Sequence, residues 1–123
     1  MIRGVVTANA AAVVRLRVCG PGGVESDVDA HVDSGFTAYL TLPATIVTAL
    51  GLVRRSGGSA VLGDGSASQF DMCAAEVEWG GTWRAVLVYV VGTEPLLGMR
   101  SLAGHKLVID VVPGGLVEIL PLP

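Results

Sequence analysis

The sequence is poor in charge and has no block of lysine or arginine. Asp, Glu, Lys and Arg make up 15% of the 123 residues, hydrophobic residues make up 51%, and the net charge is −3. This apolar fraction argues against intrinsic disorder, and the lack of a basic patch argues against an electrostatic nucleic-acid interface. A chain of this length is expected to form a single domain, residues 1–123.

The chain also has only two cysteines, Cys19 and Cys73, and no long hydrophobic run. Two cysteines without regular spacing make neither a disulfide framework nor a zinc site, so free thiols in a reducing cytosol are expected. The most apolar stretch, residues 85–91, is far too short to span a bilayer. The segment MIRGVVTANA is a poor signal peptide. We therefore expect a soluble, cytoplasmic protein.

Glycine and proline, by contrast, are plentiful and occur along the whole chain between short apolar runs. This pattern is typical of many short strands. In residues 12–19, Val14 and Leu16 alternate with arginines, and in residues 24–32 Val28 and Ala30 alternate with aspartates, as in half-buried strands. The segment 82–91 is rich in β-branched residues and is expected to be covered on both faces. Strands are predicted at residues 2–8, 12–19, 24–32, 39–42, 59–63, 66–79, 82–91, 96–97, 105–112 and 116–120.

Two helices are expected among these strands. Pro43 suits the first turn of a helix over residues 43–50, with Thr41 favoured over Leu42 as the capping residue and Gly51 ending the helix. A second, shorter helix is expected at residues 99–103. The predicted fold class is all-β: a small closed or sandwiched barrel with one main helix.

The candidate catalytic residue is Asp33, in the triplet Asp33-Ser34-Gly35 that ends the third predicted strand. Taken alone, the triplet fits an ordinary surface turn. Its position before FTAYLTLP and a helix would instead hold a carboxylate on a loop between rigid elements. Gly35 would let a ligand backbone approach closely, and the Ser34 hydroxyl could fix the loop by a hydrogen bond. The residues alone leave both interpretations open.

The chain resembles the retropepsin-like aspartic peptidases of clan AA, in particular their small single-domain bacterial members. The family usually carries Asp-Thr-Gly, and Ser34 keeps the hydroxyl of that threonine but loses its methyl group. The resemblance implies a closed acid-protease-type barrel, one lobe per chain, with a short C-terminal helix. Four segments carry it, in the order and spacing of the family: HVDSGFTAYLTLPATIVTALGL (31–52), AVLGDGS (60–66), EPLLGMRSLAG (94–104) and LVIDVVPGGLVEI (107–119).

The resemblance implies an aspartic endopeptidase that needs no metal or other cofactor. Two carboxylates share one proton, because two like charges so close together cannot both ionise easily. One activates a water as base, and the other donates a proton to the scissile carbonyl oxygen as acid. Asp33 would be catalytic, with Ser34 and Gly35 supporting its loop. The implied substrate-binding residues are Gly35, Phe36, Thr37, Leu62, Gly63, Asp64, Gly65, Leu97 and Gly98.

A second carboxylate must come from elsewhere, because the chain has one such triplet and is too short for two lobes. A twofold axis would bring Asp33 of a second chain to the site. We therefore expect a homodimer that acts on a peptide or protein, with no nucleic-acid or membrane partner. The terminal segments 2–8 and 116–120 either interleave across the dimer, as the resemblance implies, or pair within one subunit.

For several features, two interpretations remain open. The hairpin at residues 63–65 is either a flap that closes over substrate or a static turn. His31 either perturbs the site or is structural, and Trp79 and Trp83, on either side of the Gly80-Gly81 turn, could stack across a hairpin as packing residues. The alternative function, from another class, is a non-catalytic dimeric module that binds peptides or proteins on the same fold.

Overall fold

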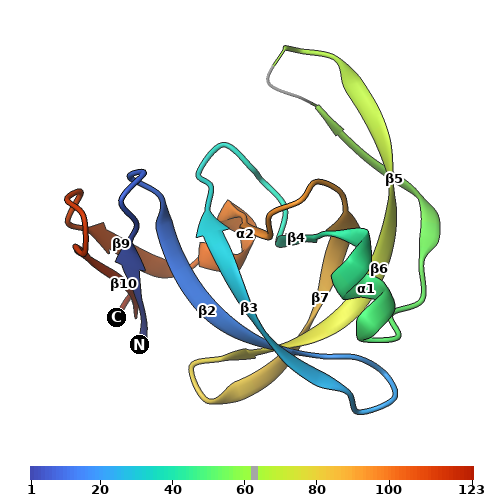
Figure 1. Ribbon diagram of the computed structural model, residues 1–123, viewed down its shortest axis with the longest axis horizontal. Helices are drawn as coiled ribbons and strands as arrows, with labels where there is room; N and C mark the ends of the chain where they lie inside the picture. The colour runs from blue at the N-terminus through green and yellow to red at the C-terminus, as the bar shows by residue number, and fades with distance from the viewer. Residues whose placement is uncertain (62–63) are drawn as a thin grey trace.

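A computed structural model describes residues 1–61 and 64–123 of the chain, which within this part is mostly β (Figure 1). In chain order its elements are β1 (Ile2–Val6), β2 (Ala12–Cys19), β3 (Glu25–Val32), β4 (Leu40–Leu42), α1 (Ala44–Ala49), β5 (Arg55–Val61), β6 (Ala67–Trp79), β7 (Thr82–Val90), β8 (Leu96–Leu97), α2 (Met99–Leu102), β9 (His105–Ile109) and β10 (Leu116–Pro121). Every predicted strand has a counterpart among the described residues, although β1 and β9 end earlier than expected and β5 begins earlier. Residues 62–63 of the predicted strand 59–63 lie outside the described residues.

Six of the strands form a closed barrel. Neighbouring strands follow the order β6-β7-β4-β8-β3-β2, and β2 pairs again with β6 at Val18 and Cys19, which closes the ring. The predicted all-β barrel with one main helix and one short helix is therefore confirmed at this level. Closure leaves no free edges among these strands, which removes sites for unwanted pairing.

The two ends of the chain form a small sheet that continues from β2. Strand β1 pairs with β2 on one side and with β10 on the other, and β10 pairs with β9. Ile2 lies opposite Ile119 and Val5 opposite Leu116. The termini accordingly lie next to each other in Figure 1. In this single chain the terminal strands pair with each other, the second of the two arrangements considered above.

The β5–β6 hairpin lies at the other side of the barrel and extends beyond it (Figure 1). Only the lower part of β6 belongs to the barrel, where it pairs with β7 from Asp71 to Trp79. The upper part of β6 pairs with β5 alone. The predicted flap hairpin therefore exists as an arm attached to the barrel through β6.

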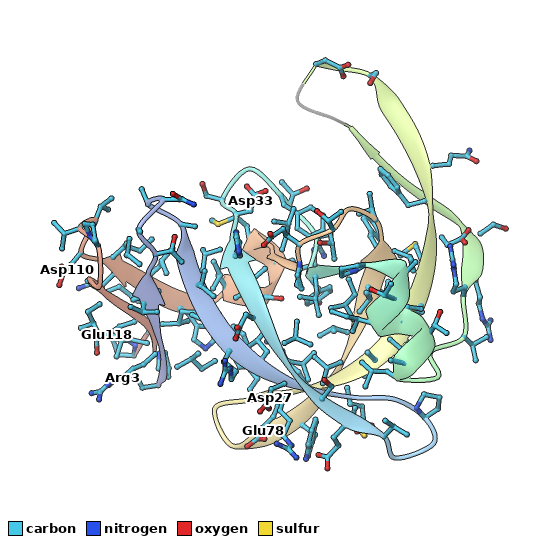
Figure 2. All side chains as sticks on the ribbon, in the orientation of Figure 1. Arg3, Asp27, Asp33, Glu78, Asp110 and Glu118 are labelled. Carbon is cyan, nitrogen blue, oxygen red and sulfur yellow. The ribbon has the colours of Figure 1, made fainter. Side chains whose placement is uncertain are left out.

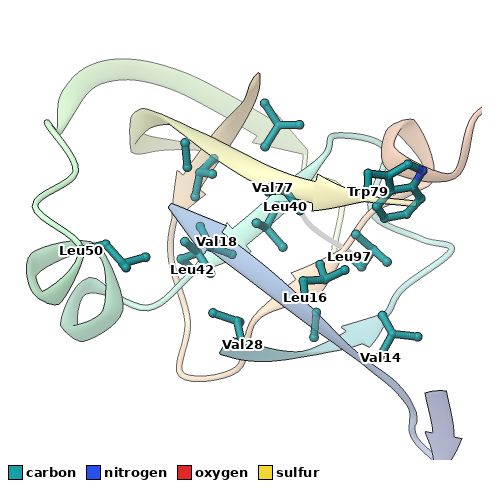
Figure 3. Close-up of a cluster of buried hydrophobic side chains, with 14 of the residues drawn as sticks. Val14, Leu16, Val18, Val28, Leu40, Leu42, Leu50, Val77, Trp79 and Leu97 are labelled. Atoms are coloured by element: carbon teal, nitrogen blue, oxygen red, sulfur yellow. The ribbon is translucent and has the colours of Figure 1, made fainter. Parts of the chain in front are cut away.

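The core follows the alternation predicted from the sequence. On β2, Val14, Leu16 and Val18 are buried, and they pack with residues such as Leu40 and Val77 inside the barrel (Figure 3). The arginines between them point outward, where they form ion pairs with carboxylates of β3. The hydrophobic effect thus sets which face of each strand points inward.

The expectation that β7 is covered on both faces is wrong. Val86, Val88 and Val90 are buried, but Leu87 between them is 53% exposed. A barrel strand has one inner and one outer face, so alternate residues of β7 point to solvent. The high content of β-branched residues reflects strand propensity here and does not indicate two-sided burial.

Helix α1 begins differently from the prediction. Its N-cap is Pro43, without a side-chain cap, and Gly51 follows its end with a φ of +66°. Thr41 is not the cap, because it is buried in β4, where its Oγ1 accepts a hydrogen bond of 2.9 Å from the Leu96 backbone N–H. The hydroxyl therefore joins β4 to β8 and does not stabilise the helix.

Trp79 and Trp83 do not stack across their hairpin. Trp79 lies opposite Thr82 and Trp83 opposite Glu78, so the register places the two indoles on opposite faces. Trp79 is buried against the ring of His105, with ring centres 5.6 Å apart, and Trp83 is exposed. The expected contact fails because the Gly80-Gly81 turn, with both φ values positive, makes a tight two-residue loop.

Both cysteines are free, as expected. Cys73 is buried, and this burial raises the pKa of its thiol. Within the described ranges, no helix is long and apolar enough to cross a membrane.

Candidate active site

Asp33 lies on the loop that connects β3 to β4 and is half-buried (Figure 2). Its Oδ1 accepts a hydrogen bond of 2.9 Å from the Gly35 N–H, and its carbonyl accepts one of 3.2 Å from the Phe36 N–H. A Cβ on Gly35 would come within 3.3 Å of that Oδ1, so a glycine leaves the carboxylate uncrowded. Among the described residues, no donor contacts Oδ2, and this oxygen is available to a ligand or a second acid.

Both ends of the loop are attached to the segment β8–α2. Strand β8 lies between β3 and β4, parallel to the first and antiparallel to the second. The Asp33 N–H donates to the Leu97 carbonyl at 3.0 Å, and the Gly98 N–H donates to the Tyr39 carbonyl at 2.9 Å. The side chain of Leu97 is only 1% exposed and belongs to the core. Leu97 thus supports the loop from behind through its backbone.

The start of α2 holds the middle of the loop. The N–H groups of Met99 and Arg100 donate to the carbonyls of Phe36 and Ala38, at 2.8 and 3.2 Å. The first N–H groups of a helix have no partner within the helix, so here the loop satisfies them. A Cβ on Gly98 would lie 2.0 Å from the Ala38 carbonyl oxygen, so this close contact requires glycine.

The other predicted residues of the loop are accessible. Ser34, Gly35 and Thr37 are exposed, and Phe36 is half-buried. The Ser34 hydroxyl makes no hydrogen bond within the described part of the chain, so backbone contacts to β8 and α2 fix the loop instead. The structure thus brings together residues 33–37 and residues 97–98, as the sequence suggested.

Of the predicted flap residues, Asp64 and Gly65 lie between β5 and β6. Leu62 and Gly63 are outside the described residues. Asp64 and Gly65 are exposed, and Gly65 has a φ of +85°. Asp64 Oδ1 accepts hydrogen bonds from the Ser66 hydroxyl, at 2.6 Å, and from the Ser66 N–H, at 2.9 Å. These bonds hold the pKa of Asp64 below its usual value and tie its carboxylate to its own turn.

An aromatic row, Phe36–Tyr89–Phe70, connects the candidate catalytic loop to the base of the hairpin. The ring centres of Phe36 and Tyr89 are 5.9 Å apart, and those of Tyr89 and Phe70 are 6.1 Å apart. Neither Tyr89 nor Phe70 was predicted from the sequence. Only the parallel pairing of β4 with β7, in which Thr41 lies opposite Tyr89, brings β7 beside the loop.

Within the described part of the chain, two hollows lie next to each other on this side of the barrel. The one beside the loop has a volume of about 250 Å³ and is lined by Thr37, Ala38, Tyr39, Met72, Leu87, Tyr89 and Arg100. A larger one of about 560 Å³, at the base of the hairpin, is lined by Pro21, Val53, Arg55, Ser56, Gly57, Met72, Cys73, Ala74 and Leu87. The two share Met72 and Leu87, so the hollow surface continues along β6 and β7.

Asp33 is remote from the other labelled carboxylates in Figure 2. Asp27 and Glu78 lie at the opposite end of the barrel, and Asp110 lies on the terminal sheet. In the described part of the chain, no group of three or more His, Cys, Asp or Glu side chains could hold a metal ion.

His31, two residues before Asp33, has a contact of its own. Its side-chain Nε2 lies 2.8 Å from Oε2 of Glu94, and its backbone N–H donates to the Pro95 carbonyl at 2.9 Å. Both contacts attach the end of β3 to the segment that leads into β8. They support the structural interpretation of this histidine.

Comparison with known proteins found no matching family model, no matching curated protein and no matching solved structure. A proposal about the function therefore rests on the geometry of the Asp33 loop.

Proposed function

We propose that the chain is an aspartic endopeptidase that works as a homodimer, with Asp33 of each subunit at the twofold axis. The observation that carries the proposal is the state of the Asp33 carboxylate. It is half-buried, its Oδ1 is oriented by the Gly35 N–H, and no donor among the described residues contacts its Oδ2. Such a carboxylate is oriented at one oxygen and accessible to a reactant at the other.

Two Asp33 side chains facing each other would share one proton, because the second negative charge is strongly disfavoured. The ionised carboxylate removes a proton from a water, whose oxygen attacks the scissile carbonyl carbon. The protonated carboxyl donates its proton to the carbonyl oxygen. When the tetrahedral intermediate collapses, the C–N bond breaks and the leaving amine takes the proton that was removed from the water. A hydroxyl of the intermediate returns its proton to the other carboxylate as the C=O bond re-forms. The Gly35 N–H stabilises the negative charge on Oδ1 throughout.

The substrate would bind in an extended conformation between the loop and the β5–β6 hairpin, largely through backbone hydrogen bonds. The hairpin extends on the side of the barrel where the Asp33 loop lies (Figure 2), and glycines near its tip suit a movable flap. The aromatic row would provide apolar subsites. Its ring contacts join the loop to the hairpin, which is where substrate side chains would lie.

Replacing Asp33 by asparagine tests the proposal. The asparagine side chain would keep the volume and an acceptor for the Gly35 N–H, so the variant should fold and dimerise as the wild type does. Cleavage of a diverse peptide library should fall by about 10²-fold or more, because general acid and base are both lost. Mass spectrometry of the products measures cleavage, and size-exclusion chromatography measures dimerisation.

Asp110→Asn is the matched control, because this exposed carboxylate lies on the terminal sheet and should leave cleavage unchanged. An Asp33→Asn chain that cleaves as fast as the wild type contradicts the proposal.

The aromatic row would also suit a non-catalytic module that binds peptides. A statine-type inhibitor separates the two functions, because its hydroxyl imitates the tetrahedral intermediate. A peptidase should bind it much more tightly than the matched unmodified peptide, whereas a module that only binds peptides should show no such preference.

A further inference from the structure

The hollow beside the Asp33 loop, about 250 Å³ in volume, has a cation at its wall. Arg100, the second residue of α2, lines it together with Thr37, Tyr39 and Tyr89. The guanidinium carbon lies 5.9 Å from the centre of the Tyr39 ring, at the distance of a cation–π contact. The Arg100 backbone is fixed to the loop by its hydrogen bond to Ala38. The charge is thus held beside the loop by both main chain and side chain.

Arg100 lacks a carboxylate partner among the described residues, although the chain has more acidic than basic residues. Most other arginines are engaged: Arg3, Arg15, Arg17 and Arg54 form ion pairs. Arg84 lies over the Trp79 ring and donates to the Ser101 carbonyl. A cation without a counter-charge at the wall of a hollow is the arrangement that recognises an anionic group.

We propose that this hollow is a subsite for an acidic side chain of the substrate and that Arg100 determines this specificity. The inference rests on the proposed function and goes beyond its apolar subsites. A glutamate would place its carboxylate at Arg100, and its methylenes would pack on Met72 and Leu87 at the same wall. Thr37, four residues after Asp33, lines the hollow, and the twofold axis of the proposed dimer would repeat it, so the acidic residue would occupy one position on each side of the scissile bond.

The test uses peptides with one cleavable core and either Glu or Gln at each flanking position in turn. At one position on each side of the scissile bond, the wild type should cleave the Glu peptide about two- to fivefold faster in kcat/KM, the range expected for an ion pair open to solvent. This ratio should fall toward one in Arg100→Gln and at high salt, which screens the charge. The Arg100→Glu variant should instead cleave a peptide with Lys at either position faster than the Gln peptide.

Lys106→Gln is the matched control, because it removes one exposed positive charge from β9, away from the hollow. The Glu/Gln ratio should stay at the wild-type value in this variant. Equal unfolding midpoints of wild type and Arg100→Gln would show that the fold is intact. A wild type that cleaves peptides without an acidic preference at any position overturns the inference, and so does an Arg100→Gln variant that keeps the preference.

Binding separates this inference from the proposed function. Fluorescence anisotropy of labelled peptides with the Asp33→Asn chain measures the Glu/Gln preference without any cleavage. If the wild type cleaves nothing but both chains bind the Glu peptide more tightly, and Arg100→Gln removes this difference, the peptidase proposal fails and the acidic subsite stands. If cleavage occurs and binding shows no preference for Glu, the subsite is wrong and the peptidase proposal stands.

Discussion

Gly98 shows how one residue can control the position of the candidate catalytic carboxylate. Its α-carbon lies so close to the loop that a Cβ would be 2.0 Å from the Ala38 carbonyl oxygen and 2.6 Å from Cδ2 of Phe36. The same residue donates its N–H to Tyr39. The loop therefore packs directly on the backbone of the segment behind it, with no side chain between them.

Gly98→Ala should lower the free energy of unfolding by about 1–3 kcal/mol, since the clash is with backbone that can move only if the loop moves. Peptide cleavage should fall as well, because the displaced loop carries Asp33. Urea denaturation followed by fluorescence measures the first effect. Gly22→Ala is the control, as its Cβ would meet nothing within 4 Å. Equal urea midpoints for Gly98→Ala and the wild type would contradict this account of the close contact.

At the scale of elements, the short strand β4 depends on its neighbours. It has three residues, all buried, and it pairs with β7 on one side and β8 on the other. The Thr41 hydroxyl adds a bond from its side chain to the Leu96 N–H. A strand this short has few backbone hydrogen bonds of its own, so this contact contributes a large share of the attachment between β4 and β8.

Thr41→Val keeps the shape of the side chain but removes the acceptor for the Leu96 N–H. Leaving this N–H without a partner should cost about 1–3 kcal/mol of unfolding free energy. Hydrogen exchange of the Leu96 amide should also become faster. Thr82→Val, at the exposed start of β7, is the control and should change neither quantity. A Leu96 amide that stays protected in Thr41→Val would show that the hydroxyl is not its essential partner.

At the scale of the whole molecule, the barrel provides one Asp33 and the proposed chemistry needs two. The terminal strands already pair within the chain, so the proposed dimer does not require their exchange. What the second subunit must supply is its own Asp33 loop, placed against the first by a twofold axis.

Mixing wild type with the Asp33→Asn chain tests this stoichiometry. After subunits exchange in an equal mixture, about half of the wild-type chains have a wild-type partner, so activity per wild-type chain should fall to about half. In an equal mixture with Asp110→Asn, whose chains are themselves expected to be active, total activity should stay constant during the incubation. Peptidase assays before and after a long incubation measure the effect. Constant activity per wild-type chain, in subunits shown to exchange, would place the whole site within one chain.

Much of the local structure was predictable because it depends on near neighbours in the chain. Alternation along β2 and β3 correctly predicted which residues are buried, and Gly51 correctly predicted the end of α1. The loop of Asp33 between a strand and a short extended piece was also correctly placed. These features follow from the two-residue period of a strand and from the backbone conformation that glycine allows.

The surroundings of Asp33 were decided by pairings between distant parts of the chain. Insertion of β8 between β3 and β4 puts Gly98 and α2 behind the loop, and pairing of β4 with β7 puts Tyr89 beside it. No local pattern specifies these neighbours, which is why the roles of Thr41, Tyr89 and Arg100 were missed. The sequence by itself determined the strands, their inner faces and the candidate triplet. Only barrel closure decided what surrounds Asp33, because burying all the inner faces together fixes the order of the strands.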